Sequence, residues 1–160
     1  MKTKTWLWFG GIIGVAFIIY IIWTAAGNSQ NCATAPVTEI NIGDHKNILS
    51  HIHQTLTITV NGEQIIIPAN IGILSGIMRP IHTHDSSGKI HVEGPCQRDF
   101  TLEEFFDLWG QTFTEDCIME NCIDETHTLK MYVNGVETTL FGDYILKADD
   151  EIEIIYEETT

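Results

Sequence analysis

The stretch TLTITVNGEQIIIP, residues 55–68, carries a strong secondary-structure signal. Polar and apolar side chains alternate over 55–60, and apolar residues return over 63–68. The pair Asn61-Gly62 between the two runs tolerates the positive φ angles that a two-residue type I′ turn requires. The sequence therefore predicts a β-hairpin at this point.

The same hairpin signal returns toward the C-terminus. TLKMYV (128–133), Asn134-Gly135 and VETTL (136–140) repeat the pattern, and a last alternating run, EIEIIYE (151–157), follows an acidic turn. The two copies indicate either a duplicated β unit or the same turn chemistry used twice. The match between them is too short to decide which.

A single helix is expected between the two hairpins. Thr101 and Glu104 have the spacing of a capping box, and Phe100 and Phe105 have the spacing of a hydrophobic staple. Gly110 supplies a stop signal. Helical spacing also places four apolar residues on one stripe, which we interpret as core: Leu102, Phe105, Phe106 and Trp109. The expected fold class is α+β, a small mixed sheet built of β-hairpins with one covering helix, which resembles a β-grasp.

An apolar run near the N-terminus, WLWFGGIIGVAFIIYIIW (6–23), predicts a membrane anchor. A bilayer core requires about 20 such residues in a helix. We expect a cytoplasmic start (1–5), a transmembrane helix (6–26), a tether (27–50) and an extracytoplasmic α+β domain (51–160). Lys2 and Lys4 precede the run, which favours a cytoplasmic N-terminus and a single-pass protein of the plasma membrane. The alternative is a signal peptide cleaved within 24–27.

The charge of the chain restricts its partners. It carries 22 acidic and 8 basic side chains, a formal net charge of −14, and no acidic residue precedes Glu39. Such a surface repels phosphate backbones, so nucleic acid is excluded as a partner. The expected partners are the membrane, through the N-terminal helix, and a membrane protein.

Four cysteines in an exported domain favour disulfides over free thiols. Cys32, Cys96, Cys117 and Cys122 allow three pairings. Cys117 with Cys122 would close a short loop and leave Cys32 with Cys96, but the sequence alone does not choose among the pairings.

Five histidines occur in three groups, at 51 and 53, at 82 and 84, and at 91. Alternate residues of a strand share a face, so each His-x-His pair points one way. The segment IHTHDSSGKIHVE (81–93) predicts a tight hairpin with a loop at 85–88, which sets His84 opposite Lys89 and His82 opposite His91. We therefore expect His82, His84 and His91 on one face, joined by His51 and His53 if their strand is adjacent.

Three or more imidazoles on one face predict a transition-metal site, for which copper and zinc are the expected ions. Asp85 and Glu93 are candidates to ligate the ion or to orient a ring. Two other interpretations stay open, namely histidines that merely make the strand face polar and a pH-responsive cluster.

The expected function is metal binding for storage, delivery or assembly of a membrane partner. The alternative is a non-catalytic interaction module of a membrane complex, with structural histidines. A small metal-dependent hydrolase with Glu93 as base is a third hypothesis. Apart from that hypothesis nothing in the sequence indicates an enzyme, since it shows no phosphate loop or dinucleotide fingerprint.

HTHDSSGKIHVE followed by FTLEEFFDLWGQ, between two Val-Asn-Gly hairpins, resembles an uncharacterised family of exported or membrane-anchored archaeal and bacterial proteins. The likeness covers roughly residues 50–156. It implies a fold and a location, and it adds weight to a site at His82, His84 and His91. It implies no mechanism.

Overall fold

The computed structural model describes residues 32–43 and 48–159. Within them the protein is a mixed α+β fold, mostly sheet with one α-helix, as the sequence predicts. The elements in chain order are β1 (Ser50–Val60), β2 (Glu63–Gln64), β3 (Ile73–Leu74), β4 (Ile77–Met78), β5 (Ile81–His82), β6 (Lys89–Gly94), α2 (Leu102–Trp109), β7 (Cys117–Ile118), β8 (Asn121–Cys122), β9 (His127–Val133), β10 (Val136–Thr138), the 3₁₀ turn η1 (Phe141–Asp143) and β11 (Glu151–Glu158).

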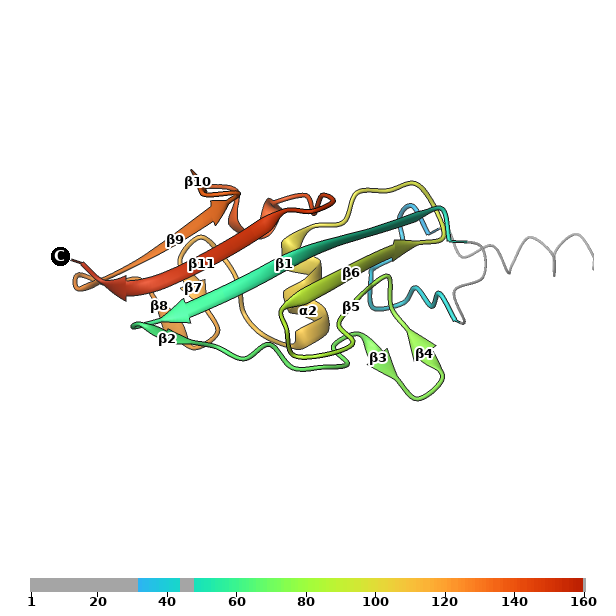
Figure 1. The fold of residues 1–160 in the computed structure, drawn as a ribbon, viewed down its shortest axis with the longest axis horizontal. Coiled ribbons are helices and arrows are strands. Elements are labelled where there is room, and N and C mark those ends of the chain that lie inside the picture. Colours follow the sequence, from blue (N-terminus) through green and yellow to red (C-terminus); the bar gives the residue numbers. More distant parts are fainter. Residues whose placement is uncertain (1–31, 44–47, 160) are drawn as a thin grey trace, which may run out of the picture. The chain divides into compact units, whose positions relative to one another are not determined.

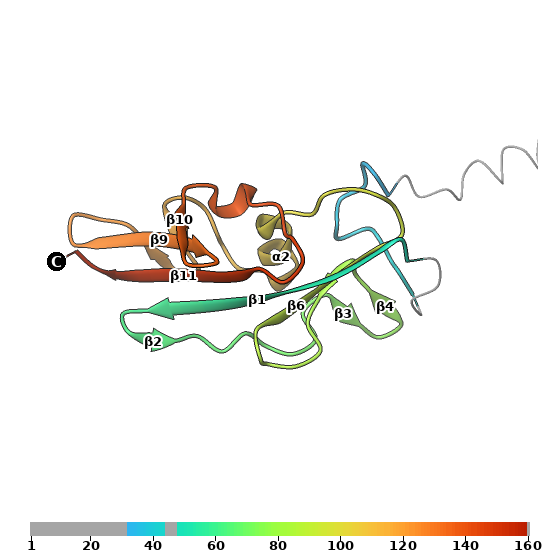
Figure 2. The ribbon, with the colours of Figure 1, turned by 45° about the horizontal axis from the view of Figure 1, so that its top comes forward.

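One main sheet organises the described residues. Its strand order is β10-β9-β11-β1-β6-β5, with β2 added to β1 (Figure 1). The two long central strands, β1 and β11, run parallel, with Leu56 beside Ile152 and Ile58 beside Ile154. Every other pairing in this sheet is antiparallel. Figure 2 shows β1 between β11 and β6 from a second direction.

Both Asn-Gly hairpins are present at the predicted positions. Asn61 and Gly62 have φ angles of 50° and 83°, and Asn134 and Gly135 have 53° and 76°, as a type I′ turn requires. The second hairpin pairs β9 with β10. The first is shorter than predicted, because β2 ends at Gln64 and the chain then leaves the sheet.

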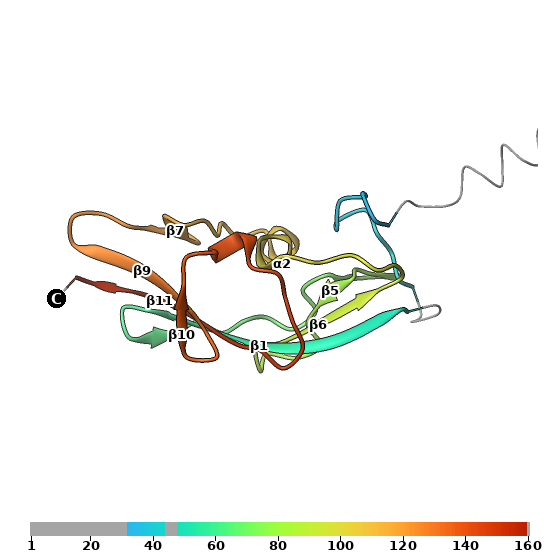
Figure 3. The same ribbon diagram turned by 90° about the horizontal axis from the view of Figure 1, so that it is seen from above.

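The helix α2 has the predicted ends. The Thr101 side chain accepts from the Glu104 backbone N–H, the Glu104 carboxylate accepts from the Thr101 N–H, and Gly110 closes the helix at a φ of 72°. Its Leu102, Phe105 and Phe106 side chains are at most 1 % exposed. They belong to the same core as the inward side chains of β1, β6 and β11. Figure 3 shows the helix lying over one side of the sheet.

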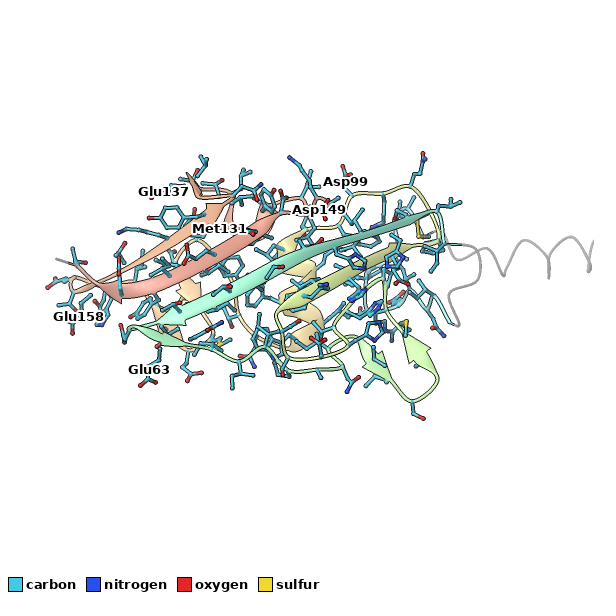
Figure 4. The ribbon with its side chains drawn as sticks, viewed as in Figure 1. Glu63, Asp99, Met131, Glu137, Asp149 and Glu158 are labelled. Carbon is cyan, nitrogen blue, oxygen red and sulfur yellow. A yellow bond between two sulfur atoms is a disulfide. The ribbon has the colours of Figure 1, made fainter. Side chains whose placement is uncertain are left out.

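The two faces of β1 lie in different environments. Its even-numbered residues face the core beneath the helix, where Leu56 and Ile58 are buried and Ile52 and Val60 are partly buried. The odd-numbered residues, His51 and His53 among them, therefore point to the opposite face, because successive side chains of a strand alternate. Acidic side chains lie at the periphery of the sheet, where Glu63, Glu137 and Glu158 project outward (Figure 4).

Residues 32–43, which fall within the predicted tether, are packed against the domain. A disulfide joins Cys32 to Cys96, and Ile40 and Ile42 are at most 6 % exposed. Arg98 donates hydrogen bonds to the carbonyls of Cys32 and Ala35. The second disulfide joins Cys117 to Cys122 across β7 and β8, so one of the three open pairings is realised.

The expected transmembrane helix at 6–26 lies outside the described residues. Among residues 32–43 and 48–159, no helix is long and apolar enough to cross a membrane.

Gln54 is the one residue of β1 whose burial conflicts with its chemistry. It is 2 % exposed, and neither its Oε1 nor its Nε2 has a hydrogen-bond partner among the described residues. A buried, unsatisfied polar group destabilises a fold by about 1–3 kcal/mol. We predict that Gln54→Met, which keeps the volume and removes the amide, raises the free energy of unfolding in urea by about that amount.

The matched control is Gln64→Met on the exposed strand β2, which should leave the urea midpoint nearly unchanged. A lower midpoint for Gln54→Met than for the unaltered chain would mean that the amide is hydrogen-bonded after all.

Candidate metal centre

Three neighbouring strands bring four histidines, His51, His53, His82 and His91, onto one face of the sheet. In the pairing of β1 with β6, His53 lies opposite His91 and His51 opposite Glu93. In the pairing of β5 with β6, His82 lies opposite His91. The predicted register of His82 and His91 is therefore confirmed, and the strand carrying His51 and His53 is indeed adjacent.

His91 is the centre of this histidine cluster (His51, His53, His82, His84 and His91). Its ring centroid lies 4.3 Å from that of His53 and 4.7 Å from that of His84, both nearly perpendicular to it. It also stacks on His82 at 5.3 Å with an interplanar angle of 14°. One imidazole thus contacts histidines from both flanking segments.

The ring nitrogens form two overlapping groups that could hold a metal ion. We call His51, His53 and His91 the outer triad, and His82, His84 and His91 the inner triad. Within each triad one nitrogen per residue lies within 4.8 Å of the others. The structure thus brings together all five predicted histidine ligands, and the two triads share His91.

Within each triad the closest nitrogens have the separation expected of neighbouring ligands. The Nε2 atoms of His51 and His53 are 2.9 Å apart, and those of His82 and His84 are 3.2 Å apart. Two nitrogens bound about 2.0–2.1 Å from one ion lie about 2.9 Å apart at a right angle and about 3.3 Å apart at the tetrahedral angle. Both pairs can therefore bind one ion with little movement.

The inner triad is built around a fully buried ring. His82 is 0 % exposed, and its Nδ1 lies 3.0 Å from the carbonyl oxygen of Arg79. Because a carbonyl only accepts, Nδ1 carries the hydrogen and the Nε2 of the neutral ring carries the lone pair. This contact orients His82 as outer partners orient metal-bound histidines.

The backbone at Gly72 lies close to His82. A Cβ on Gly72 would lie 2.3 Å from the Ile81 carbonyl oxygen and 3.2 Å from the His82 Cβ, and its φ is 72°. Only glycine fits such a position without displacing the loop. The loop 70–79 can therefore lie directly against β5.

The predicted pairing of His84 with Lys89 is wrong, because β5 ends at His82. Thr83 lies against the 68–71 segment: its hydroxyl donates to the Pro68 carbonyl and accepts from the Ile71 N–H. Lys89 therefore has no partner in β5, and on the other side of β6 it pairs with Thr55 of β1. His84 nevertheless reaches the cluster from the loop, through His82 and His91.

The outer triad has no fully buried ring and lies beside a carboxylate. The His51 side chain is 50 % exposed, whereas that of Glu93 is 2 % exposed. Glu93 Oε1 lies 3.1 Å from His51 Nε2. Since a carboxylate only accepts, His51 donates from Nε2, and an ion at that nitrogen would replace this hydrogen.

Asp85, the other expected acidic partner, lies in the loop after His84. Its carboxylate accepts from the Ser87 backbone N–H at 2.9 Å. Hydrogen bonds from Ser87 lower the pKa of Asp85 below its usual value. The structure therefore places Asp85 as a turn-forming residue beside the cluster.

Crowding of the rings favours their neutral form, which is the form that binds metals. Burial, together with the charges that His53, His84, His51 and Lys89 can carry, lowers the pKa of His91 to about 4. Burial and the same kind of repulsion, from His51 and Lys89, also lower the pKa of His53. His91 Nδ1 is buried and has no hydrogen-bond partner among the described residues.

The remaining histidines do not extend the described cluster. His127 lies on β9, where it contacts Asp124 and stacks on Tyr156. His45 lies outside the described residues.

Three residues that position the cluster were not singled out from the sequence: Gly72, Arg79 and Thr83. Arg79 and Thr83 act largely through backbone groups and long-range bonds. For Gly72 the sequence offers one clue, a glycine between Ile71 and Ile73, which is typical of a close backbone approach.

No family model, curated protein or solved structure matches this chain. The resemblance to an uncharacterised family thus stays an expectation from the sequence, and any function must be argued from the geometry above.

The pKa of His91 predicts how the metal-free protein responds to acid. The unfolded chain protonates this histidine near its ordinary value of 6.5, whereas the folded protein does so only near pH 4. Unfolding therefore takes up a proton in this window, and stability falls as the pH drops from 6.5 toward 4. We predict that His91→Gln loses less unfolding free energy than the unaltered chain between pH 7 and pH 4.5, measured by urea unfolding with a chelator present.

The control for this measurement is His127→Gln, a histidine outside the cluster, which should retain the full acid-dependent loss. Equal losses in the His91→Gln variant and the unaltered chain would contradict the prediction.

Proposed function

We propose that this protein binds a transition-metal ion, copper or zinc, through its histidine cluster. The observation that supports this most is the convergence of five imidazoles into two triads whose nitrogens lie within 4.8 Å of one another. A strand face that is merely polar does not require its histidines to converge. Packing neutral rings together also removes water from their polar atoms, which costs free energy.

The ligand set favours these two ions over magnesium and calcium. Neutral imidazole suits zinc and copper, while magnesium and calcium prefer oxygen ligands. All four cysteines are bonded in disulfides, so thiolate does not compete as a ligand. The net charge of −14 attracts cations toward the domain in general.

The setting supports storage, delivery or assembly more than catalysis. The outer triad includes a half-exposed ring, so an ion there can exchange with a partner. Glu93, the residue suited to a general base, is buried and already bonded to His51. We therefore assign it a positioning role.

We further propose that the domain is displayed outside the cell by the anchor expected at 6–26, beside a membrane-protein partner. The two disulfides support an oxidising compartment. The sheet supports a β-grasp-like arrangement, since its first and last long strands run parallel at the centre with a helix over one face.

The second candidate is a non-catalytic interaction module with structural histidines. One observation favours it: His82 and His51 have hydrogen-bond partners that need no ion, namely the Arg79 carbonyl and Glu93.

Metal analysis separates the two candidates. We predict that the full-length chain, loaded with Zn²⁺ or Cu²⁺ and dialysed, retains about one equivalent per chain. The variant His53→Ala/His82→Ala/His91→Ala leaves a single imidazole of each triad and should retain almost none. Zinc and copper content is measured by elemental mass spectrometry.

His127→Ala, which removes a histidine outside the cluster, should retain metal like the unaltered chain. If the unaltered chain keeps no ion, and its melting temperature does not rise on adding Zn²⁺ or Cu²⁺, the interaction module is the better description.

A further inference from the structure

The cluster contains more ligands than one ion can use. A zinc or cuprous ion takes about four ligands, often with one position open, whereas five imidazoles meet here. The five imidazoles form two triads, which share His91 and have no other member in common. This inference rests on the proposed metal binding and concerns how the ion is held.

We propose that the cluster holds one ion at a time and passes it between two positions, the outer triad and the inner triad, with His91 bound throughout. A neutral imidazole offers a single lone pair in its ring plane. His91 can therefore serve one ion, and an ion in either triad leaves the other triad one ligand short.

Charge also disfavours two ions. Their ligands would be neutral rings, and the carboxylate in contact with them is Glu93, at the edge of the outer triad. Lys89, a cation, lies close enough to lower the pKa of both His53 and His91. Glu93 and Asp149 act in the opposite direction on the pKa of His53. Two divalent ions sharing one imidazole would lie close together and repel strongly.

The ring arrangement permits the transfer by simple ligand exchange. His91 contacts His53 on one side and His82 and His84 on the other. As the bonds from the ion to His51 and His53 break, bonds to His82 and His84 form. The ion keeps its oxidation state, and no other reactant is needed.

The two positions differ in the burial of one ligand. Each triad includes one exposed ring, His51 in the outer triad and His84 in the inner triad, but the inner triad also includes His82, which is fully buried beneath the loop 70–79. A partner can reach an ion in either position, and an ion in the inner position is better retained because one of its ligands is fully buried. The pair of positions thus suits a protein that delivers metal.

The test follows the imidazole nitrogens by NMR during titration of the full-length chain with Zn²⁺. We expect the resonances of all five cluster histidines to shift together and to saturate at one equivalent. His127 is the internal control and should not shift. Shifts confined to one triad, or saturation at two equivalents, would overturn the proposal while leaving metal binding intact.

Two double variants add a second measurement. His51→Gln/His53→Gln and His82→Gln/His84→Gln each remove one pair and should each still retain about one equivalent of zinc after dialysis, because the other triad is complete. Complete loss of zinc in either variant would show a single fixed position. If the unaltered chain binds no zinc and none of its imidazoles shifts, it is the proposed function itself that fails.

Discussion

The register of β6 between β1 and β5 is the constraint on which both the core and the histidine cluster depend. Ile90 and Val92 point into the core from this strand, so His91 and Glu93 must point to the other face. A slip of one residue would exchange the two sets. The hydrophobic burial that folds the domain therefore also aligns the four imidazoles carried by strands, while His84 reaches them from the loop after β5.

The histidine cluster places polar groups in a partly buried region, which lowers the stability of the fold. His91 Nδ1 is buried without a partner among the described residues, and burial, together with the charges that neighbouring histidines and Lys89 can carry, lowers the pKa values of His91 and His53. Proteins tolerate such local conflicts mainly at functional sites. Gly72 also belongs to this region, because the absence of a Cβ lets its loop lie against Ile81 and His82.

Local patterns predicted the parts of the fold that local physics determines. The Asn-Gly turns, the capping box at Thr101 and the opposition of His82 and His91 all follow from spacing, and all are confirmed. The predicted pairing of His84 with Lys89 was wrong, because β5 ends at His82 and Thr83 forms hydrogen bonds with a distant segment. The packing of residues 32–43 against the domain likewise depends on contacts far apart in the sequence, and alternation alone does not reveal them.

The disulfides and the histidines together limit which chemistry the domain can offer. Cysteine is the stronger ligand for soft metals, but both pairs of sulfur atoms are consumed in bonds that hold residue 32 to 96 and 117 to 122. The candidate ligands that remain on the face opposite α2 are five imidazoles of unequal exposure, with the Glu93 carboxylate beside His51. Under the proposed function, neutral rings would bind a cation without neutralising it, so the acidic surface of the domain would supply the long-range attraction and the rings the selectivity. Such a division of roles would account for imidazoles gathered on one face of a chain so rich in carboxylates.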